Sequence, residues 1–126
     1  MKVLVAEDDS TIRAMIGTLL TRRGVACSLA ADGERAVEAW ESGDFQMIFM
    51  DVQMPGMDGL EATRAIREKE EIQGGHVAII AMTAHTMPED MEECFQSGMD
   101  GYLSKPIVFA DLLALIDRYR EREDGD

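Results

Sequence analysis

Short apolar segments alternate with amphipathic ones along the whole chain, and this alternation restricts the fold more than any other sequence feature. The apolar segments lie near residues 2–6, 25–30, 46–50, 77–82 and 101–104. The first of them shows no polar alternation, which is typical of a strand covered on both faces. Strand and helix signals alternate five times, which predicts an α/β fold with a doubly wound, five-stranded parallel sheet and five helices. Right-handed crossovers leave few strand orders for such a sheet.

The amphipathic segments carry the usual signals for the start of a helix. Ser10, Asp32 and Asp58 are expected N-caps, and the run from Thr86 to Glu89 is typical of a capping box. Apolar residues recur three and four positions apart, as on the buried face of a helix. The residues expected to face the core are Ile12, Ile16, Leu19, Leu20, Ala36, Val37, Trp40, Ala62, Ile66, Met91, Cys94, Phe95, Phe109, Leu112, Leu113, Ile116 and Tyr119.

The length and charge of the chain exclude several classes of function. A chain of 126 residues is expected to form one domain over residues 1–122, with a charged tail at 123–126. No apolar run approaches the roughly 18 residues of a membrane helix, and no signal peptide is evident, so a cytoplasmic domain is expected. Twenty-five acidic against twelve basic residues give a net charge of -13, which argues against binding to nucleic acid or to an anionic membrane.

Ionisable and hydroxyl side chains follow most of the predicted strands. Glu7 and Asp8 follow the first strand, Asp51 the third, Thr83 the fourth and Lys105 the fifth. Parallel strands present their carboxyl ends at one edge of the sheet, where ligands bind, so these residues are expected to meet there. Carboxylates that crowd together need raised pKa values or a bound divalent cation. Oxygen ligands without His or Cys favour Mg²⁺, for which Mn²⁺ can substitute.

Asp51 is the acid least compatible with an ordinary surface role. It follows the apolar run MIFM directly, and a carboxylate left charged, dry and unpaired there would cost several kcal/mol. Lys105 offers a positive charge and Thr83 a hydroxyl donor. Both suit a tetrahedral anion, such as a phosphoryl group, attached covalently between them.

Four motifs together resemble the receiver domain of two-component response regulators. They are VLVAEDDS, MDVQMPGMDG, IIAMTA and GYLSKPI, in that order along the chain. The longer run MDVQMPGMDGLEATRAIR, followed by AMTAHTM, is most similar to receivers attached to hybrid sensor histidine kinases. The resemblance implies a flavodoxin-like sheet in the order 2-1-3-4-5 and a cis bond between Lys105 and Pro106.

The resemblance also implies a role for each residue of the predicted site. Asp51 would be the phosphoacceptor, and Lys105 would contact the phosphoryl oxygens. Asp8 and Asp51 would bind Mg²⁺ directly, Glu7 through metal-bound water, and Gln53 through its backbone carbonyl. Many receivers have Asp where this chain has Glu7; the longer side chain keeps the charge and shifts the geometry of this contact.

By the same resemblance, phosphorylation would move the Thr83 hydroxyl toward the phosphoryl group and turn Tyr102 inward. The surface of the fourth helix, fifth strand and fifth helix would then be read by other proteins. Gln53 and His85 would flank the route of the hydrolytic water, with the direction of their effect left open, and an exposed loop position is the alternative for His85. His76 is expected to be an ordinary loop residue.

A sensor histidine kinase or a histidine phosphotransfer protein would be the partner of such a domain, which would act as a monomer or weak homodimer. It would catalyse only its own phosphorylation and dephosphorylation. One alternative is a magnesium-dependent phosphatase resembling the haloacid dehalogenase family, which needs a second Asp where this chain has Gln53, a residue that cannot titrate. The other is a receiver-like interaction module that is never phosphorylated, although Asp51 and Lys105 are both present.

Overall fold

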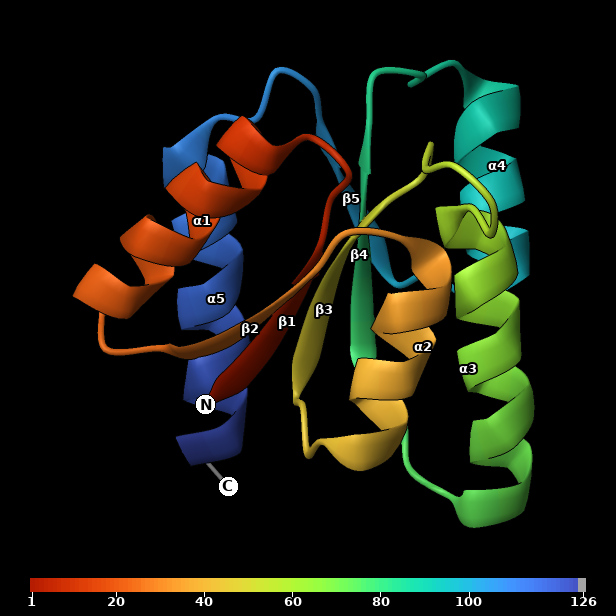
Figure 1. Cartoon of the computed structure of the whole chain (residues 1–126), viewed down its shortest axis with the longest axis horizontal. Helices are drawn as coiled ribbons and strands as arrows, with labels where there is room; N and C mark the ends of the chain where they lie inside the picture. The colour runs from red at the N-terminus through yellow and green to blue at the C-terminus, as the bar shows by residue number, and fades with distance from the viewer. Residues whose placement is uncertain (125–126) are drawn as a thin grey trace.

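A computed structural model describes residues 1–124, and these form a five-stranded parallel sheet in the order β2-β1-β3-β4-β5. The predicted fold class and strand order are therefore confirmed. Helices cover both faces of the sheet (Figure 1). The strands are β1 (Lys2–Ala6), β2 (Ala26–Ala30), β3 (Met47–Asp51), β4 (Ala78–Thr83) and β5 (Gly101–Ser104).

The helices form two layers, one on each side of the sheet. Figure 1 shows α1 (Ser10–Arg22) and α5 (Phe109–Asp124) on one side, with α2 (Gly33–Ser42), α3 (Gly59–Gln73) and α4 (Pro88–Ser97) on the other. α5 extends into the segment predicted as a charged tail, of which residues 125–126 lie outside the described part of the chain. The bond between Lys105 and Pro106 is cis, as expected.

The three central strands, β1, β3 and β4, contribute side chains to two cores. In β3, Met47 and Phe49 pack with residues of α1 and α5, whereas Ile48 and Met50 pack with residues of α2, α3 and α4. Both faces of β3 are consequently buried. This explains why the sequence shows an unbroken apolar run there rather than a polar alternation.

Two predicted helix starts are wrong by one residue. Asp9, not Ser10, is the N-cap of α1, because its carboxylate accepts hydrogen bonds from the amides of Thr11 and Ile12. At α4 the cap is Met87, and Asp90 accepts a 3.3 Å hydrogen bond from the Met87 amide. Before α1 several polar residues stand in a row, so pattern alone does not say which one turns toward the free amides. At α4 the cap residue is apolar and Pro88 begins the helix, so no polar side chain marks the start.

Phe95 is a further correction, since its side chain is 47% exposed rather than turned to the core. It lies on α4, where Cys94 and Ser97 are the buried positions. The small side chains at these two positions let the helix lie close to its neighbours, and the bulky ring remains on the solvent side.

The end of β3 differs from the predicted boundary in a way that matters for the site. Asp51 is the last residue of the strand and pairs in register with Met82 of β4, rather than following the strand. α3 begins immediately against this strand end, and a Cβ atom at Gly59 would lie only 2.2 Å from the Asp51 carbonyl oxygen. Glycine at this position is what lets the helix approach the strand so closely.

None of the helices in the described part of the chain combines the length and the apolar character that crossing a bilayer requires.

Candidate functional site

Three carboxylates meet at the carboxyl edge of the sheet. Oxygen atoms of Glu7, Asp8 and Asp51 all lie within 4.8 Å of one another. The Lys105 ammonium reaches into the same cluster, with its Nζ 3.0 Å from Glu7 Oε1 and 3.0 Å from Asp51 Oδ1. The structure thus brings together the four charged residues that the sequence placed after three different strands.

Backbone hydrogen bonds at the strand ends hold these residues in place. The Glu7 amide donates to the Ala30 carbonyl at 3.0 Å, which continues the β1–β2 pairing by one residue. The Lys105 amide donates to the Thr83 carbonyl at 2.8 Å and does the same for β4 and β5. Because each side chain sits one residue beyond a paired strand, its position follows directly from the sheet.

Arg13 and Asp9 support Glu7 in a way that sequence reasoning missed. Arg13 Nη1 donates to the Glu7 carbonyl at 2.7 Å, and the Asp9 amide donates to Glu7 Oε2 at 3.0 Å. Glu7 itself is completely buried. The one available signal was the run of three acids before a basic residue in the first turn of a helix, which is too common a pattern to identify a contact.

The electrostatics of the cluster are unbalanced, with three carboxylates against one ammonium. Burial raises the pKa of Asp51 to about 7, and the adjacent carboxyl groups of Glu7 and Asp8 add to the effect. The interaction with Asp51 in turn lowers the pKa of Asp8. Burial works against the charge of Lys105, but the contacts with Asp51 and Glu7 outweigh it and raise the pKa of this ammonium.

The donor set fits a hard divalent cation. Asp51 Oδ2 is buried and has no hydrogen-bond partner among the described residues, although Asp51 is only 2% exposed. An unpaired buried carboxylate oxygen is costly unless something binds it. Asp8, on the solvent side of the cluster, is exposed, so an ion could reach the cluster from solution. Carboxylate oxygens are ligands that Mg²⁺ prefers.

Gln53 and His85 form a bridge between the two loops beside the cluster. Their side chains are joined by a 3.0 Å contact from Gln53 Nε2 to His85 Nε2. The His85 amide donates to the Thr83 hydroxyl at 2.9 Å, and this hydroxyl donates to the His85 carbonyl at 3.3 Å. The Thr83 hydroxyl is therefore engaged with its own loop. The sequence singled out these three residues but did not predict that they are connected.

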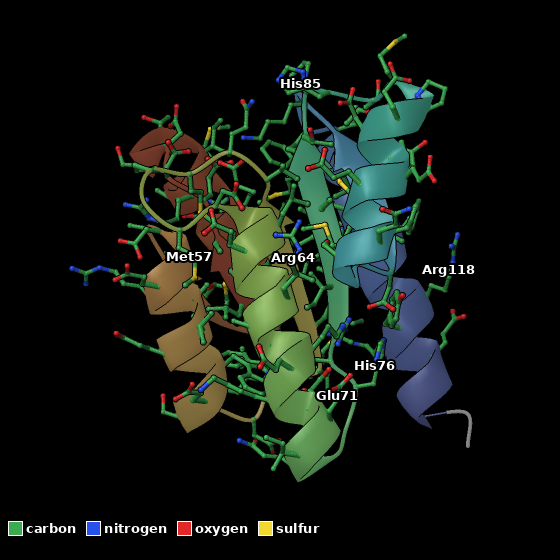
Figure 2. All side chains as sticks on the ribbon, turned by 90° about the vertical axis from the view of Figure 1, so that its right-hand side faces the viewer. Met57, Arg64, Glu71, His76, His85 and Arg118 are labelled. Atoms are coloured by element: carbon green, nitrogen blue, oxygen red, sulfur yellow. The ribbon has the colours of Figure 1, made fainter. Side chains whose placement is uncertain are left out.

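A groove of about 580 Å³ opens beside the carboxylates. The residues that line it include Asp8, Gln53, His85 and Asp90 of α4. Figure 2 shows His85 at the end of the molecule where the loop enters α4. The two bridged loops would thus surround a small anionic group brought to Asp51.

Tyr102 is the one predicted functional residue that the structure leaves outside the site. Its side chain is 45% exposed on β5, the strand at the edge of the sheet. Among the described residues, no side-chain hydrogen bond or ion pair joins it to Thr83 or Lys105. Its predicted inward turn would have to follow a change elsewhere.

Comparisons with known proteins agree on one family. The sequence model of the response regulator receiver domain matches residues 3–117. "Hybrid signal transduction histidine kinase I" of Dictyostelium discoideum is 48% identical over 111 residues, which cover 84% of this chain and 6% of that protein. "Sensor histidine kinase GacS" of Pseudomonas protegens is 42% identical over 116 residues, covering 91% of this chain and 13% of that protein. The chain thus spans a small fraction of the length of these relatives.

Solved structures agree with the sequence comparisons. The Saccharomyces cerevisiae Ssk1 receiver domain, crystallised with the histidine phosphotransfer protein Ypd1, is 32% identical with a TM-score of 0.91, covering 94% of this chain and 88% of that one. The receiver domain of sensor histidine kinase PA1611 from Pseudomonas aeruginosa is 37% identical with a TM-score of 0.83, covering 94% and 95%. That structure holds a magnesium ion in its active-site cleft.

Proposed function

The chain belongs to the response regulator receiver domain family, and we propose that it accepts a phosphoryl group on Asp51 from a phosphohistidine in a two-component phosphorelay. The observation that carries this proposal is the setting of Asp51. One carboxylate oxygen lies 3.0 Å from the Lys105 ammonium, and the other is buried and free of hydrogen bonds from the described residues. A nucleophile with one oxygen oriented and the other available suits phosphoryl transfer.

The proposed reaction is an in-line displacement at phosphorus. A carboxylate oxygen of Asp51 forms the new P–O bond while the P–N bond of the phosphohistidine breaks, and the imidazole nitrogen keeps the bonding electron pair. A small acyl phosphate could donate in the same way. Lys105 remains protonated and neutralises charge on the transferred oxygens. The domain modifies itself once per cycle, and it is not an enzyme acting on a separate substrate.

We assign the magnesium ligands by the same reasoning. Asp8, Asp51 and the backbone carbonyl of Gln53 would bind Mg²⁺ directly, with Glu7 acting through a metal-bound water and Mn²⁺ able to substitute. The bound ion would supply positive charge for the phosphoryl oxygens and relieve the repulsion among the carboxylates. The magnesium in the related PA1611 receiver supports this assignment.

The proposed switch begins at Thr83. To reach a phosphoryl group on Asp51, its hydroxyl must leave the amide and carbonyl of His85, to which it is now bonded. Tyr102 would then turn inward from its present exposed position. The surface formed by α4, β5 and α5 would carry the change to other proteins.

Gln53 and His85 are proposed to control the lifetime of the phosphoryl group. Their side chains bridge the loops at the groove beside Asp51. A closed bridge would obstruct a water molecule approaching in line with the new P–O bond. The bridge would therefore slow hydrolysis, which gives a direction to the effect that the sequence left open.

The partner proposed for this chain is a histidine phosphotransfer protein or a sensor histidine kinase. Two similar relatives are a hybrid histidine kinase and a sensor histidine kinase, and the similar Ssk1 receiver was crystallised with a phosphotransfer protein. We further propose that the chain does not bind nucleic acid, because its net charge is -13, and that it is a monomer or weak homodimer.

Intact-mass spectrometry tests the proposal against both alternatives. The wild-type protein and the Asp51→Asn variant are each incubated with Mg²⁺ and acetyl phosphate. Circular dichroism checks that both are folded. A receiver gains one phosphoryl group that the variant lacks. A phosphatase hydrolyses many phosphate esters per molecule, which is disfavoured here because Gln53 stands where such enzymes need an acid. A module that is never phosphorylated does neither.

A further inference from the structure

A second charged cluster lies at the opposite end of the molecule from Asp51, and it is centred on Arg67 of α3. The three nitrogens of its guanidinium group bind three different partners. Nε donates to the Gly98 carbonyl at 2.8 Å, Nη1 to Glu70 Oε1 at 2.6 Å, and Nη2 to Asp100 Oδ2 at 2.8 Å. The Arg67 side chain is only 16% exposed, so these bonds are largely shielded from water.

The two carboxylates extend this cluster to the start of β4. Glu70 Oε2 accepts from the Val77 amide at 2.7 Å, and Asp100 Oδ2 accepts from the Ile79 amide at 2.8 Å. His76, expected to be an ordinary loop residue, bonds Asp100 Oδ1 through its Nε2 at 2.7 Å. Figure 2 shows His76 and His85 at opposite ends of the layer that contains α3 and α4. We call Arg67, Glu70, Asp100 and His76 the Arg67 junction.

The Arg67 junction holds one end of α4. Gly98 ends this helix in the left-handed conformation with φ of 112°, and a Cβ there would lie 2.6 Å from Arg67 Cγ. Arg67 thus packs against the end of α4 and also donates to the carbonyl of its C-cap. The buried residues of α4, Cys94 and Ser97, lie in the same half of the helix.

The other end of α4 is held much less firmly. Its cap, Met87, is 60% exposed, and the cap hydrogen bond from the Met87 amide to Asp90 is 3.3 Å long and exposed to solvent. Apart from the partly buried Asp90 and Met91, residues 84–93 are exposed. This is also the end near the phosphorylation site, because Asp90 and Glu93 line the groove beside Asp51.

We infer that Arg67 is the pivot of α4: the Arg67 junction fixes residues 94–100, so a rearrangement at the phosphorylation site can move residues 84–93 only. The movement part of this inference rests on the proposed function, whereas the anchoring part does not. One guanidinium group satisfies three acceptors that lie in three directions, which the compact ammonium of lysine cannot reproduce. Local opening of the C-terminal half of α4 must break these bonds first.

Hydrogen exchange followed by mass spectrometry on the unphosphorylated protein tests the anchoring. Arg67→Lys keeps the charge but loses the three-way contact, and we expect the amides of residues 94–100 to exchange at least about tenfold faster, as the loss of one bond to a charged group predicts. Arg64→Lys is the matched control, because it makes the same change at an exposed position of the same helix. Equal exchange in both variants would overturn the pivot. If Arg67→Lys does not fold, Asp100→Asn carries the same test.

A second measurement tests the movement and separates it from the proposed function. Wild-type protein is treated with Mg²⁺ and acetyl phosphate, and its phosphorylation at Asp51 is read from the same sample. The change in exchange is expected within residues 84–93, with 94–100 unaltered. Equal change in both halves of α4 would refute the pivot. Absence of phosphorylation would refute the proposed function, while the comparison of Arg67→Lys with Arg64→Lys would still decide the anchoring.

Discussion

Asp51→Asn removes one negative charge from a cluster in which three carboxylates share one ammonium, and we expect it to stabilise the metal-free protein. Asparagine has nearly the same shape as aspartate, so the packing at the end of β3 is retained. The variant no longer has to ionise a buried Asp51 beside Glu7 and Asp8, so this free-energy cost is absent. A proposed metal ligand would thus be a residue that destabilises the fold until its ion is bound.

The magnitude follows from the raised pKa of Asp51. This pKa moves from 3.8 to about 7, and one unit corresponds to about 1.4 kcal/mol, so ionised Asp51 costs the fold up to about 4 kcal/mol above pH 7. The asparagine amide will not find full partners in the site, so we expect a net gain of about half that, about 2 kcal/mol. For a domain of this size the gain corresponds to a rise in Tm of about 5–10 °C.

The dependence on pH has a definite sign. Because the folded state holds the Asp51 proton to higher pH than the unfolded chain does, wild-type stability falls as pH rises from about 4 to about 7. Asp51→Asn lacks this loss. The difference in Tm between the two proteins should therefore be largest near pH 8 and close to zero or reversed at pH 5, because the cost of ionising Asp51 falls by more than half while the cost of the unpaired amide does not depend on pH.

Thermal melts in EDTA at pH 5 and pH 8, repeated with Mg²⁺, measure these effects. Asp44→Asn is the control for a general change in net charge, since Asp44 is exposed and lies outside the cluster. Added Mg²⁺ should raise the Tm of the wild type more than that of Asp51→Asn. The reasoning is refuted if Asp51→Asn melts no higher than the wild type at pH 8 in EDTA, or if the gap is the same at both pH values.

Three further predictions concern neighbouring residues. Lys105→Gln should act in the opposite direction and lose about 1–2 kcal/mol in EDTA at pH 8, because it leaves the carboxylates without a cation; urea denaturation measures this, and a gain would contradict it. Gly59→Ala should lose at least about 2 kcal/mol, since its Cβ would lie 2.2 Å from a β3 carbonyl oxygen, whereas Gly17→Ala, which meets only a side chain at 3.3 Å, should be close to neutral in the same assay. His85→Ala and Gln53→Ala should each shorten the half-life of the phosphorylated protein several-fold. The double variant should shorten it no further, because both residues act through one hydrogen bond. Intact-mass spectrometry over time measures the half-lives, and additive effects in the double variant would contradict this prediction.

Much of the site could be predicted because it depends on where strands end. Glu7 and Lys105 each follow an apolar run, and parallel strands must bring such positions to one edge whatever the surrounding details. The error at the start of α1 arose where several possible caps stand together. Asp9 rather than Ser10 caps α1 because the choice depends on which side chain faces the free amides, and local sequence does not contain that information.

By itself, the sequence determined the class of fold, the gathering of the acids with Lys105, and the family to which the chain belongs, because strand periodicity and the order of motifs are local patterns. Only the tertiary structure decided which polar groups are connected across the chain. The bridge from Gln53 to His85 spans 32 residues, and the bond from Arg67 to Asp100 spans 33. Such bonds depend on distances and directions that exist only after the sheet and both helical layers have packed, so no local pattern encodes them.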